Sequence, residues 1–243
     1  MKTVQTSLFL GLIFLSLINY GQEINFGLQV GYGNYKMTSL QNLTQSLAAP
    51  LPSHEAAIIS EYPPNVYLQA EANLTFIDNK FSIGMVASVN STGSRVHYSD
   101  YSGSYRFDAM LSDYTLGSIF KARLFRFSKI DIKAYSEFGF SSTTLTIEEY
   151  FQIDSEIYGR RQSYDSSPAY LEPGLRANYS FGAFELGISA GYAINIGDTF
   201  TIIGNEIVIL ANPYTRETIV ADWSGLRLGI TASFRVFTLK DKK

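Results

Sequence analysis

The stretch GLRLGITASFRVF, residues 225–237, decides the fold of this chain. Apolar side chains occupy every second position from Leu226 to Val236, and the positions between them include two arginines, Arg227 and Arg235. A period of two places these two sets on opposite faces of a β-strand. One face of the strand is therefore apolar and the other carries arginines, and the class of the protein depends on which face meets water.

The composition excludes several classes of function. The 243 residues include no cysteine, so disulfides, thiolate metal sites and a cysteine nucleophile are excluded. A net charge of -3 excludes a polybasic nucleic-acid binder, because little would neutralise a run of phosphates. With only two histidines, a His-rich metal cluster is excluded as well. We therefore expect no cofactor, no metal and no nucleic-acid partner.

The N-terminal sequence MKTVQTSLFLGLIFLSLINYG, residues 1–21, predicts a cleaved signal peptide. Lys2 supplies the positive start, and Leu8–Ile18 is an apolar core of signal-peptide length. The alternative is an N-terminal membrane anchor, but this core is short for a membrane helix. Cleavage between Gly21 and Gln22 leaves a barrel domain over residues 22–237 and a short periplasmic tail over residues 238–243.

Alternation of apolar and polar residues is the main signal after Gln22. It predicts eight strands, near Ile24–Lys36, Asn65–Ile77, Phe81–Asn90, Met110–Leu124, Ile130–Phe140, Tyr170–Phe181, Phe184–Tyr192 and Gly225–Phe237. Ile119 breaks the pattern of the fourth strand, and Pro173 counts against a central position for the sixth. The turns after the second, fourth and sixth strands are short. Long loops are predicted at Met37–Tyr62, Tyr150–Ser167 and Asp198–Asp222.

Aromatic residues gather at both ends of these predicted strands. At the short-turn end lie Phe26, Phe76, Phe81, Phe125, Phe127, Phe181, Phe184 and Phe234. About ten residues away, the expected second level holds Tyr35, Tyr67, Tyr170, Tyr192 and Trp223. This spacing predicts two aromatic girdles on strands that cross a bilayer with a tilt.

The polar face of the strands indicates which side is wet. A soluble lipocalin-like barrel would need an outer face rich in Lys and Glu, but this face holds mostly small and uncharged residues. Its isolated charges nearly balance: Glu71, Asp131, Glu137, Glu172 and Glu185 against Lys121, Arg123, Lys133, Arg176, Arg227 and Arg235. Such a set favours a lumen of paired ions, with Tyr67, Tyr135 and Tyr170 beside them and lipid on the apolar face. We therefore predict a closed antiparallel up-and-down eight-stranded transmembrane β-barrel, all-β in class.

With its Gly21–Gln22 junction, eight alternating strands and aromatic-rich last strand, the chain resembles the small eight-stranded bacterial outer-membrane barrels. These are the OmpA/OmpX-like transmembrane family, in the Bacteroidota-type form called "outer membrane protein beta-barrel domain". The resemblance implies the outer membrane of a Gram-negative bacterium, with membrane lipid as a partner. One departure is that TLKDKK follows Phe237, where the family often ends on a terminal Phe.

Three functions stay open from the sequence. The first is a structural or surface-interaction role through long extracellular loops, with an extracellular or envelope protein as partner and no catalytic activity. The second is a narrow channel or a small-solute or lipid-binding barrel. The third is a lipid A-modifying acyl hydrolase, because HYSD, residues 97–100, is similar to the His-x-Ser-Asn stretch of the lipid A deacylase family. That resemblance would make His97 the base and Ser99 the nucleophile.

Overall fold

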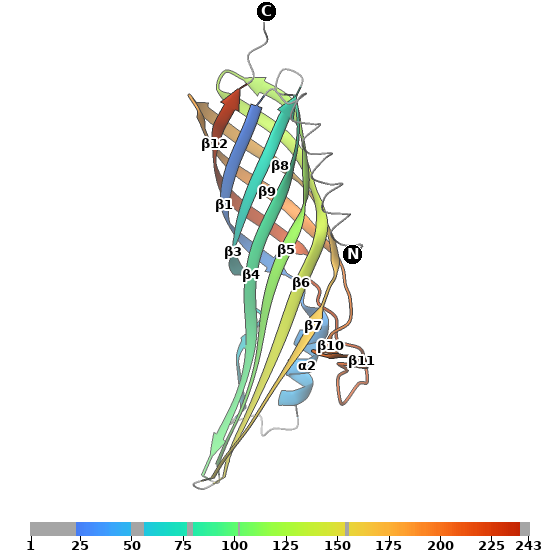
Figure 1. Ribbon diagram of the computed structural model, residues 1–243. Coiled ribbons are helices and arrows are strands. Elements are labelled where there is room, and N and C mark those ends of the chain that lie inside the picture. The colour runs from blue at the N-terminus through green and yellow to red at the C-terminus, as the bar shows by residue number, and fades with distance from the viewer. Residues whose placement is uncertain (1–22, 50–55, 77–79, 102, 154–155, 239–243) are drawn as a thin grey trace, which may run out of the picture.

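The structure is a computed structural model that describes residues 23–49, 56–76, 80–101, 103–153 and 156–238 (Figure 1). The predicted signal peptide and its cleavage point, as well as residues 239–243 of the predicted tail, lie outside the described residues. Among the described residues, no helix has the length and apolar character needed to cross a membrane.

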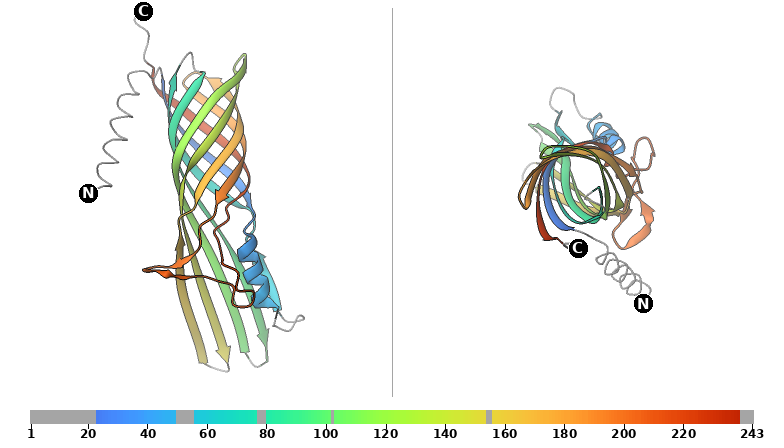
Figure 2. Two further views of the ribbon diagram at one scale, coloured as in Figure 1. Left: turned by 90° about the vertical axis from the view of Figure 1, so that its right-hand side faces the viewer. Right: turned by 90° about the horizontal axis from the view of Figure 1, so that it is seen from above.

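Eight antiparallel strands close into a ring (Figure 2, right). In the order of both chain and space they are β1 (Glu23–Tyr35), β3 (Asn65–Phe76), β4 (Phe81–Asp100), β5 (Gly103–Phe127), β6 (Ile130–Ile153), β8 (Ala169–Phe181), β9 (Phe184–Ile196) and β12 (Gly225–Thr238). The last strand pairs back with the first along its whole length, from Glu23 opposite Thr238 to Tyr35 opposite Gly225. The predicted closed up-and-down barrel is therefore confirmed.

A sheet protrudes from the end of the barrel opposite the short turns (Figure 1). It consists of the far halves of β4, β5 and β6, together with β2 (Ala56–Glu61), β7 (Glu156–Ser166), β10 (Thr201–Ile202) and β11 (Asn205–Ile209). The prediction of a loop over Tyr150–Ser167 is wrong, because β6 and β7 form a hairpin with Thr143 opposite Ser166 and Ile153 opposite Glu156. This hairpin has no continuous apolar face, so the hydrophobic period that reveals a strand is missing there.

The concave side of the protruding sheet is covered by a helix and a long excursion. The predicted loop Met37–Tyr62 contains the helix α2 (Thr38–Ala48) and the strand β2. The helix packs against the protruding sheet, and so does the long segment between β9 and β12. Together these elements bury an apolar core over the mouth of the barrel that lies opposite the short turns, and this core includes Met37, Leu40, Leu43, Val96, Phe107, Leu111, Leu145, Phe200, Ile219 and Trp223. We call this set the outer cap.

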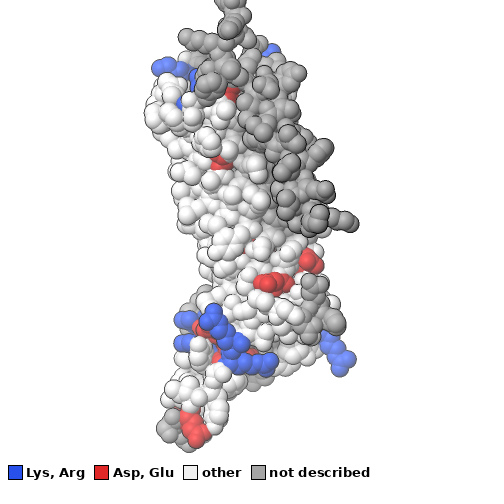
Figure 3. All heavy atoms as spheres, in the orientation of Figure 1, with Lys and Arg blue, Asp and Glu red and all other residues white. Residues whose placement is uncertain are grey.

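The outer wall of the barrel is apolar, as predicted. Leu28, Ile188 and Ile230 are each about two-thirds exposed on it, and their strand neighbours Gln29, Ser189 and Thr231 are buried inside. On the face seen in Figure 3, the uncovered part of the wall shows few charged side chains, whereas charges gather on the protruding sheet and appear again at the short-turn end. Exposed apolar side chains and a buried polar lumen are the pattern of a barrel in lipid.

The two predicted aromatic girdles have different outcomes. At the short-turn end, Phe184 packs between Phe181 and Phe234, with ring centroids 6.0 and 4.9 Å apart. At the other level, Tyr35, Tyr67, Tyr170 and Trp223 are buried and do not face lipid, so their assignment to a girdle is wrong. The separate assignment of Tyr67 and Tyr170 to the lumen is confirmed. Tyr192, the remaining residue predicted for this girdle, is exposed, and Tyr32 and Tyr114 are exposed as well.

Two residues that disturbed the sequence pattern have local explanations. Ile119 faces the lumen, where it packs with Val86 and Tyr135 in a small apolar cluster. Pro173 lies within β8, and the ladder from β8 to β9 runs from Leu171 directly to Gly174 without it. The missing proline donor is therefore accommodated by a local gap in one ladder.

We predict that Ile188→Arg destabilises the barrel by about 2–4 kcal/mol, because it places a charge near the middle of the lipid-facing wall. The matched control is Ile157→Arg on the protruding hairpin. The two isoleucines are exposed to 65% and 70%, so they differ in position along the barrel axis and not in burial. Urea unfolding in lipid vesicles measures both changes. Equal costs for the two variants would contradict the assignment of the lipid-facing wall.

Candidate functional site

The charged residues predicted to face the lumen all lie there. Glu71, Lys121, Asp131, Glu137, Glu172, Arg176 and Arg227 are buried, and Arg123, Lys133, Glu185 and Arg235 are half-buried nearer the mouth. They come from six of the eight ring strands, because each strand contributes the side chains of its inward parity. The lumen is therefore an ionic core assembled from residues far apart in sequence.

Buried ion pairs fill the middle of the lumen. The Glu71 carboxylate lies 2.6 Å from Lys121 Nζ and 2.8 Å from Arg176 Nη1. The Glu172 carboxylate lies 2.7 Å from Arg227 Nη1 and accepts a hydrogen bond of 2.8 Å from the Tyr135 hydroxyl. Because these groups are buried away from bulk solvent, each charge depends on its partner for stabilisation.

Uncharged donors and an aromatic ring complete this layer. Gln69 donates a hydrogen bond of 2.8 Å to Glu137, a carboxylate for which no ion pair is seen within the described chain. The guanidinium of Arg227 stacks on the ring of Tyr67, 3.8 Å from its centroid. The tyrosine rings thus fill volume between the ions and stabilise a cation as well.

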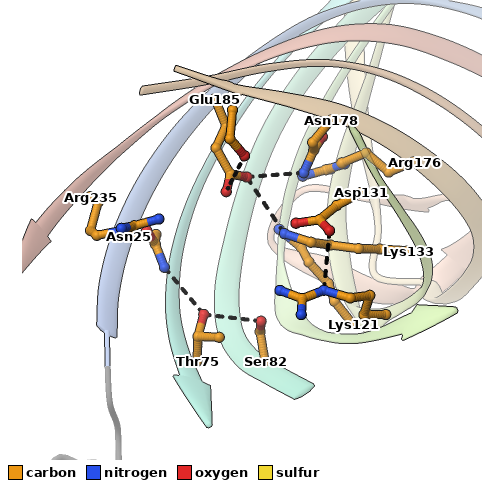
Figure 4. A network of polar contacts seen from close by, with 12 residues as sticks. Asn25, Thr75, Ser82, Lys121, Asp131, Lys133, Arg176, Asn178, Glu185 and Arg235 are labelled. Carbon is orange, nitrogen blue, oxygen red and sulfur yellow. Dashed lines mark hydrogen bonds and ion pairs between the residues drawn. The ribbon is translucent and has the colours of Figure 1, made fainter. Parts of the chain in front are cut away.

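A second ionic layer forms the mouth at the short-turn end (Figure 4). Asp131 accepts two hydrogen bonds of 2.7 Å from Arg126 and lies 3.2 Å from Arg123. Lys133 and Glu185 are 3.5 Å apart, and Asn178 donates to Glu185 at 3.1 Å.

The mouth also contains charged residues that the sequence analysis missed. Glu23 pairs with Arg235 at 3.2 Å, and its place on the inward parity of β1 could have revealed it. The orientation of Arg126 follows from a bulge between Arg123 and Phe125, which breaks the period of two. No alternation pattern could have placed Arg126 beside Asp131.

A third polar layer lies just below the outer cap. The buried carboxylate of Asp113 accepts hydrogen bonds from Thr115 at 2.8 Å and from Thr143 at 2.7 Å. The indole of Trp223 donates to the same Thr143 hydroxyl at 3.0 Å, and Tyr35 meets Trp223 edge to face at 5.0 Å. Asp113 shares the parity of Thr115, so the sequence contained the signal for its inward position.

Little space remains within these layers. The mouth retains a polar cavity of about 30 Å³, and the cavity beside Asp113 measures about 20 Å³. A single water needs roughly 10–15 Å³ by this measure, so each cavity holds about one or two waters. Neither of these two cavities forms a continuous water path from one end of the barrel to the other.

A larger pocket opens on the concave side of the protruding sheet. It has a volume of about 300 Å³ and lies between Leu43 and Leu47 of α2, Phe107 and Ile147 of the sheet, and Leu210. Glu149, Arg160, Gln162 and Tyr164 add polar groups to its lining. Burial raises the pKa of the Tyr164 phenol, so this residue is a neutral donor at physiological pH. Larger grooves of about 710 and 580 Å³ lie on the apolar outer wall, where lipid tails would occupy them.

The convex face of the protruding sheet holds a cluster of arginines and carboxylates. Arg95 contacts Asp108 through hydrogen bonds of 2.5 and 2.9 Å, and this carboxylate raises the pKa of the guanidinium. Arg106 lies 3.2 Å from Asp108 and over the ring of Tyr150, 4.3 Å from its centroid. These contacts hold the outward side chains of three adjacent strands in fixed positions.

The structure places His97 and Ser99 on β4, beyond the ring. They are on the same side of the strand, opposite Arg106 and Ser104 of β5. No hydrogen bond joins His97 to Ser99 in the described part of the chain. An acidic stretch, EEYFQIDSE, occupies residues 148–156, and its first residue, Glu148, lies 3.4 Å from Arg161. The described residues contain no group of His, Cys, Asp and Glu side chains arranged to hold a metal.

Comparison with solved structures finds outer-membrane proteins with low sequence identity. Ail, the attachment invasion locus protein of Yersinia pestis, is similar with a TM-score of 0.38 and 12% identity, over 88% of this chain and 99% of that one. Ail in complex with the heparin analogue sucrose octasulfate gives a TM-score of 0.41 and 14% identity over the same shares. The outer membrane protease OmpT from Escherichia coli gives 0.41 and 7%, over 89% and 97%. The sequence matches no protein-family model and no curated protein.

We predict that Glu172→Gln destabilises the barrel by about 3–5 kcal/mol, because Arg227 is left as a buried and uncompensated charge. Arg161→Gln is the control: its side chain is 69% exposed and its pair with Glu148 should contribute less than about 1 kcal/mol. Urea unfolding in detergent micelles measures both.

A third variant combines Glu172→Gln with Arg227→Met. It should lose less stability than Glu172→Gln alone, because the unpaired cation is gone. The wild-type protein should also carry no steady ion current in a planar bilayer. Large, stable open channels would contradict the filled lumen seen here.

Proposed function

We propose that this chain is an outer-membrane protein of a Gram-negative bacterium, and that it presents the protruding sheet to the outside as an interaction surface. The observation that carries this proposal is the combination of a filled lumen with a wall built for lipid. A barrel whose lumen is filled by side chains would serve to anchor the protruding sheet in the membrane. The proposed role requires no catalytic step.

The orientation follows from the lengths of the connections. Bacterial barrels of this kind keep short turns in the periplasm and long excursions outside. Here the turns near Ser128 and Gly182 are tight, with positive φ angles of 55° and 68°, and all long excursions leave the other end. The protruding sheet, α2 and the pocket beside it would then face the extracellular medium.

The protruding sheet offers a backbone edge to a partner. β7 pairs with β6 on one side, and on its other side β10 pairs only with Tyr164 and Asp165. From Glu156 to Gln162, no described strand covers this second side. Unpaired backbone groups at a sheet edge can accept a strand from another chain, and Arg160 and Arg161 would favour an acidic one. We propose an extracellular or envelope protein as this partner.

The outer pocket supports a second candidate function, the binding of a small amphipathic ligand. Its volume of about 300 Å³ is at the lower end of the range typical of ligand sites, and apolar walls with a few converging polar groups are typical as well. In the described chain, Arg160 makes no hydrogen bond or ion pair, although Glu149 stands opposite it across the β6–β7 ladder. Both groups are therefore free to contact a ligand.

We predict that a cysteine at Tyr158 reacts with a membrane-impermeant maleimide on intact cells and that a cysteine at Lys129 does not. The chain contains no cysteine of its own, so each variant has a single reactive thiol. Both positions are exposed, at opposite ends of the barrel. Labelling of Lys129→Cys alone would show that the orientation is reversed.

A second experiment separates the two candidate functions. One variant shortens both hairpins by joining Tyr98 to Tyr105 and Tyr150 to Gly159, positions that face each other in the ladders. The other variant, Leu210→Trp, fills the pocket. We expect shortening to abolish adhesion of expressing cells to protein-coated surfaces while leaving a folded, heat-modifiable barrel. Leu210→Trp should leave adhesion unchanged, and loss of adhesion in that variant alone would favour the ligand pocket.

A further inference from the structure

The free side of β7 carries charges of both signs on one face of the sheet. From Glu156 to Gln162 this side pairs with no described strand, because β10 pairs only with positions nearer the barrel. Arg160 lines the pocket on the concave side, and Tyr158 and Glu156 share its parity and therefore its face. All three side chains are exposed. This edge therefore presents a carboxylate and a guanidinium, with an aromatic ring midway between them.

Both charged groups have the capacity for a further partner. Arg161 pairs with Glu148 on the opposite face, whereas Arg160 has no ion pair in the described chain. Glu156 accepts a hydrogen bond from the Tyr158 hydroxyl. A carboxylate offers about four acceptor positions, so Glu156 can accept from a guanidinium as well. Backbone groups along the same edge can accept another strand.

A copy of the same strand is a complementary partner for this edge. When a strand pairs antiparallel with its own copy, a two-fold axis places one residue opposite itself. With the axis at Tyr158, Glu156 of each copy lies opposite Arg160 of the other, so the same ion pair forms twice. On the opposite face, Ile157 of each copy lies opposite Gly159, which has no side chain to obstruct it. Cross-strand pairs of opposite charges and of aromatic rings stabilise a sheet.

Other positions of the two-fold axis fit less well. An axis at Gly159 places Glu156 opposite the uncharged Gln162. An axis at the next residue, an arginine, places like charges opposite each other, which is destabilising. An axis one residue nearer the tip than Tyr158 pairs only three residues of β7, none of them basic. The axis at Tyr158 avoids these faults, and the pairing ends before the positions that β10 occupies.

The direction of the protruding sheet determines where the second copy lies. In Figures 1 and 2 the sheet continues the barrel along its long axis. The two-fold axis of an antiparallel pair is perpendicular to the sheet, and therefore roughly perpendicular to the barrel axis. It turns the second barrel to point in the opposite direction. Two copies in one membrane have the same orientation, so this pairing joins copies in two membranes that face each other.

We propose that β7 pairs antiparallel with β7 of a second copy in a facing membrane, and that the chain thereby joins neighbouring cells. This inference rests on the proposed function, in which the protruding sheet faces outward and its free edge is an interaction surface. The extracellular partner is then the same chain on another cell. Its Glu156 supplies the acidic group that Arg160 requires, and its backbone supplies the added strand.

Mixed clumping of cells tests this pairing. Cells that express the full chain carry one of two fluorescent labels, and flow cytometry counts the clumps that contain both colours. Wild-type cells should form mixed clumps. Glu156→Arg alone, or Arg160→Glu alone, should reduce their number about tenfold, because each places like charges opposite each other twice. Mixing cells of the two variants should restore clumping, because each substituted position then meets an opposite charge.

The variant with both substitutions in one chain keeps the net charge of the wild type. It should clump with itself and not with wild-type cells, since the charges then repel in both pairs. Arg161→Glu is the control for a change of charge alone, because this side chain lies on the opposite face of the sheet, and it should clump as the wild type does. Heat modifiability on gels confirms that every variant forms the barrel.

Two results would overturn the proposal: wild-type cells that clump no more than cells without the protein, or a mixture of the two single variants that clumps no more than each variant alone. Adhesion to protein-coated surfaces, measured on the same cells, separates this failure from failure of the proposed function. Cells that adhere without clumping overturn the pairing of copies and leave the interaction surface intact. Loss of both overturns the pairing and contradicts the interaction surface as well.

Discussion

The pairing of β12 with β1 is the constraint on which the rest of the structure depends. Lipid offers no hydrogen bonds, so a sheet that enters it must leave no strand edge unpaired, and only closure achieves this. Once the ring is closed, every strand has one side toward lipid and one toward the lumen, which enforces the period of two. A ring of eight strands has an interior just wide enough for side chains to fill. Closure therefore determines both the apolar wall and the crowding of polar groups inside.

Because the lumen is crowded, only a few arrangements of its charged side chains are stable. A buried ion is stable only beside a partner of opposite charge and good geometry, as Glu172 is beside Arg227. Carboxylates that lack a cation use neutral donors, as Asp113 does with two threonine hydroxyls. The outer end uses apolar packing in place of ions, through α2 and Trp223. The same lumen is thus closed by ion pairs at one end and by an apolar cap at the other.

The barrel could be predicted from the sequence because lipid on one side of each strand and a crowded lumen on the other make apolar and polar residues alternate strictly. The alternation placed the ionic residues correctly for the same reason, since parity alone determines which side a residue faces. The prediction from sequence failed where a β-bulge, or the lack of an apolar face, obscures the period of two. The bulge before Phe125 changes parity and hides the role of Arg126, and the hairpin around Gly159 has no apolar face to reveal its strands. The outer pocket joins α2 to distant strands, and no local pattern encodes that contact.

The filled middle of the barrel separates its two ends physically and chemically. The mouth near Arg126 and the free edge of β7 lie at opposite ends of the barrel, and the buried ion pairs of Glu71 and Glu172 lie between them. Communication between the ends would require movement of strands that are paired on both sides within the ring, which costs many hydrogen bonds at once. The two ends are therefore best treated as independent sites on one rigid support. That independence explains how the mouth can hold ion pairs while the opposite end has an apolar core, although the same three strands, β4, β5 and β6, run through both.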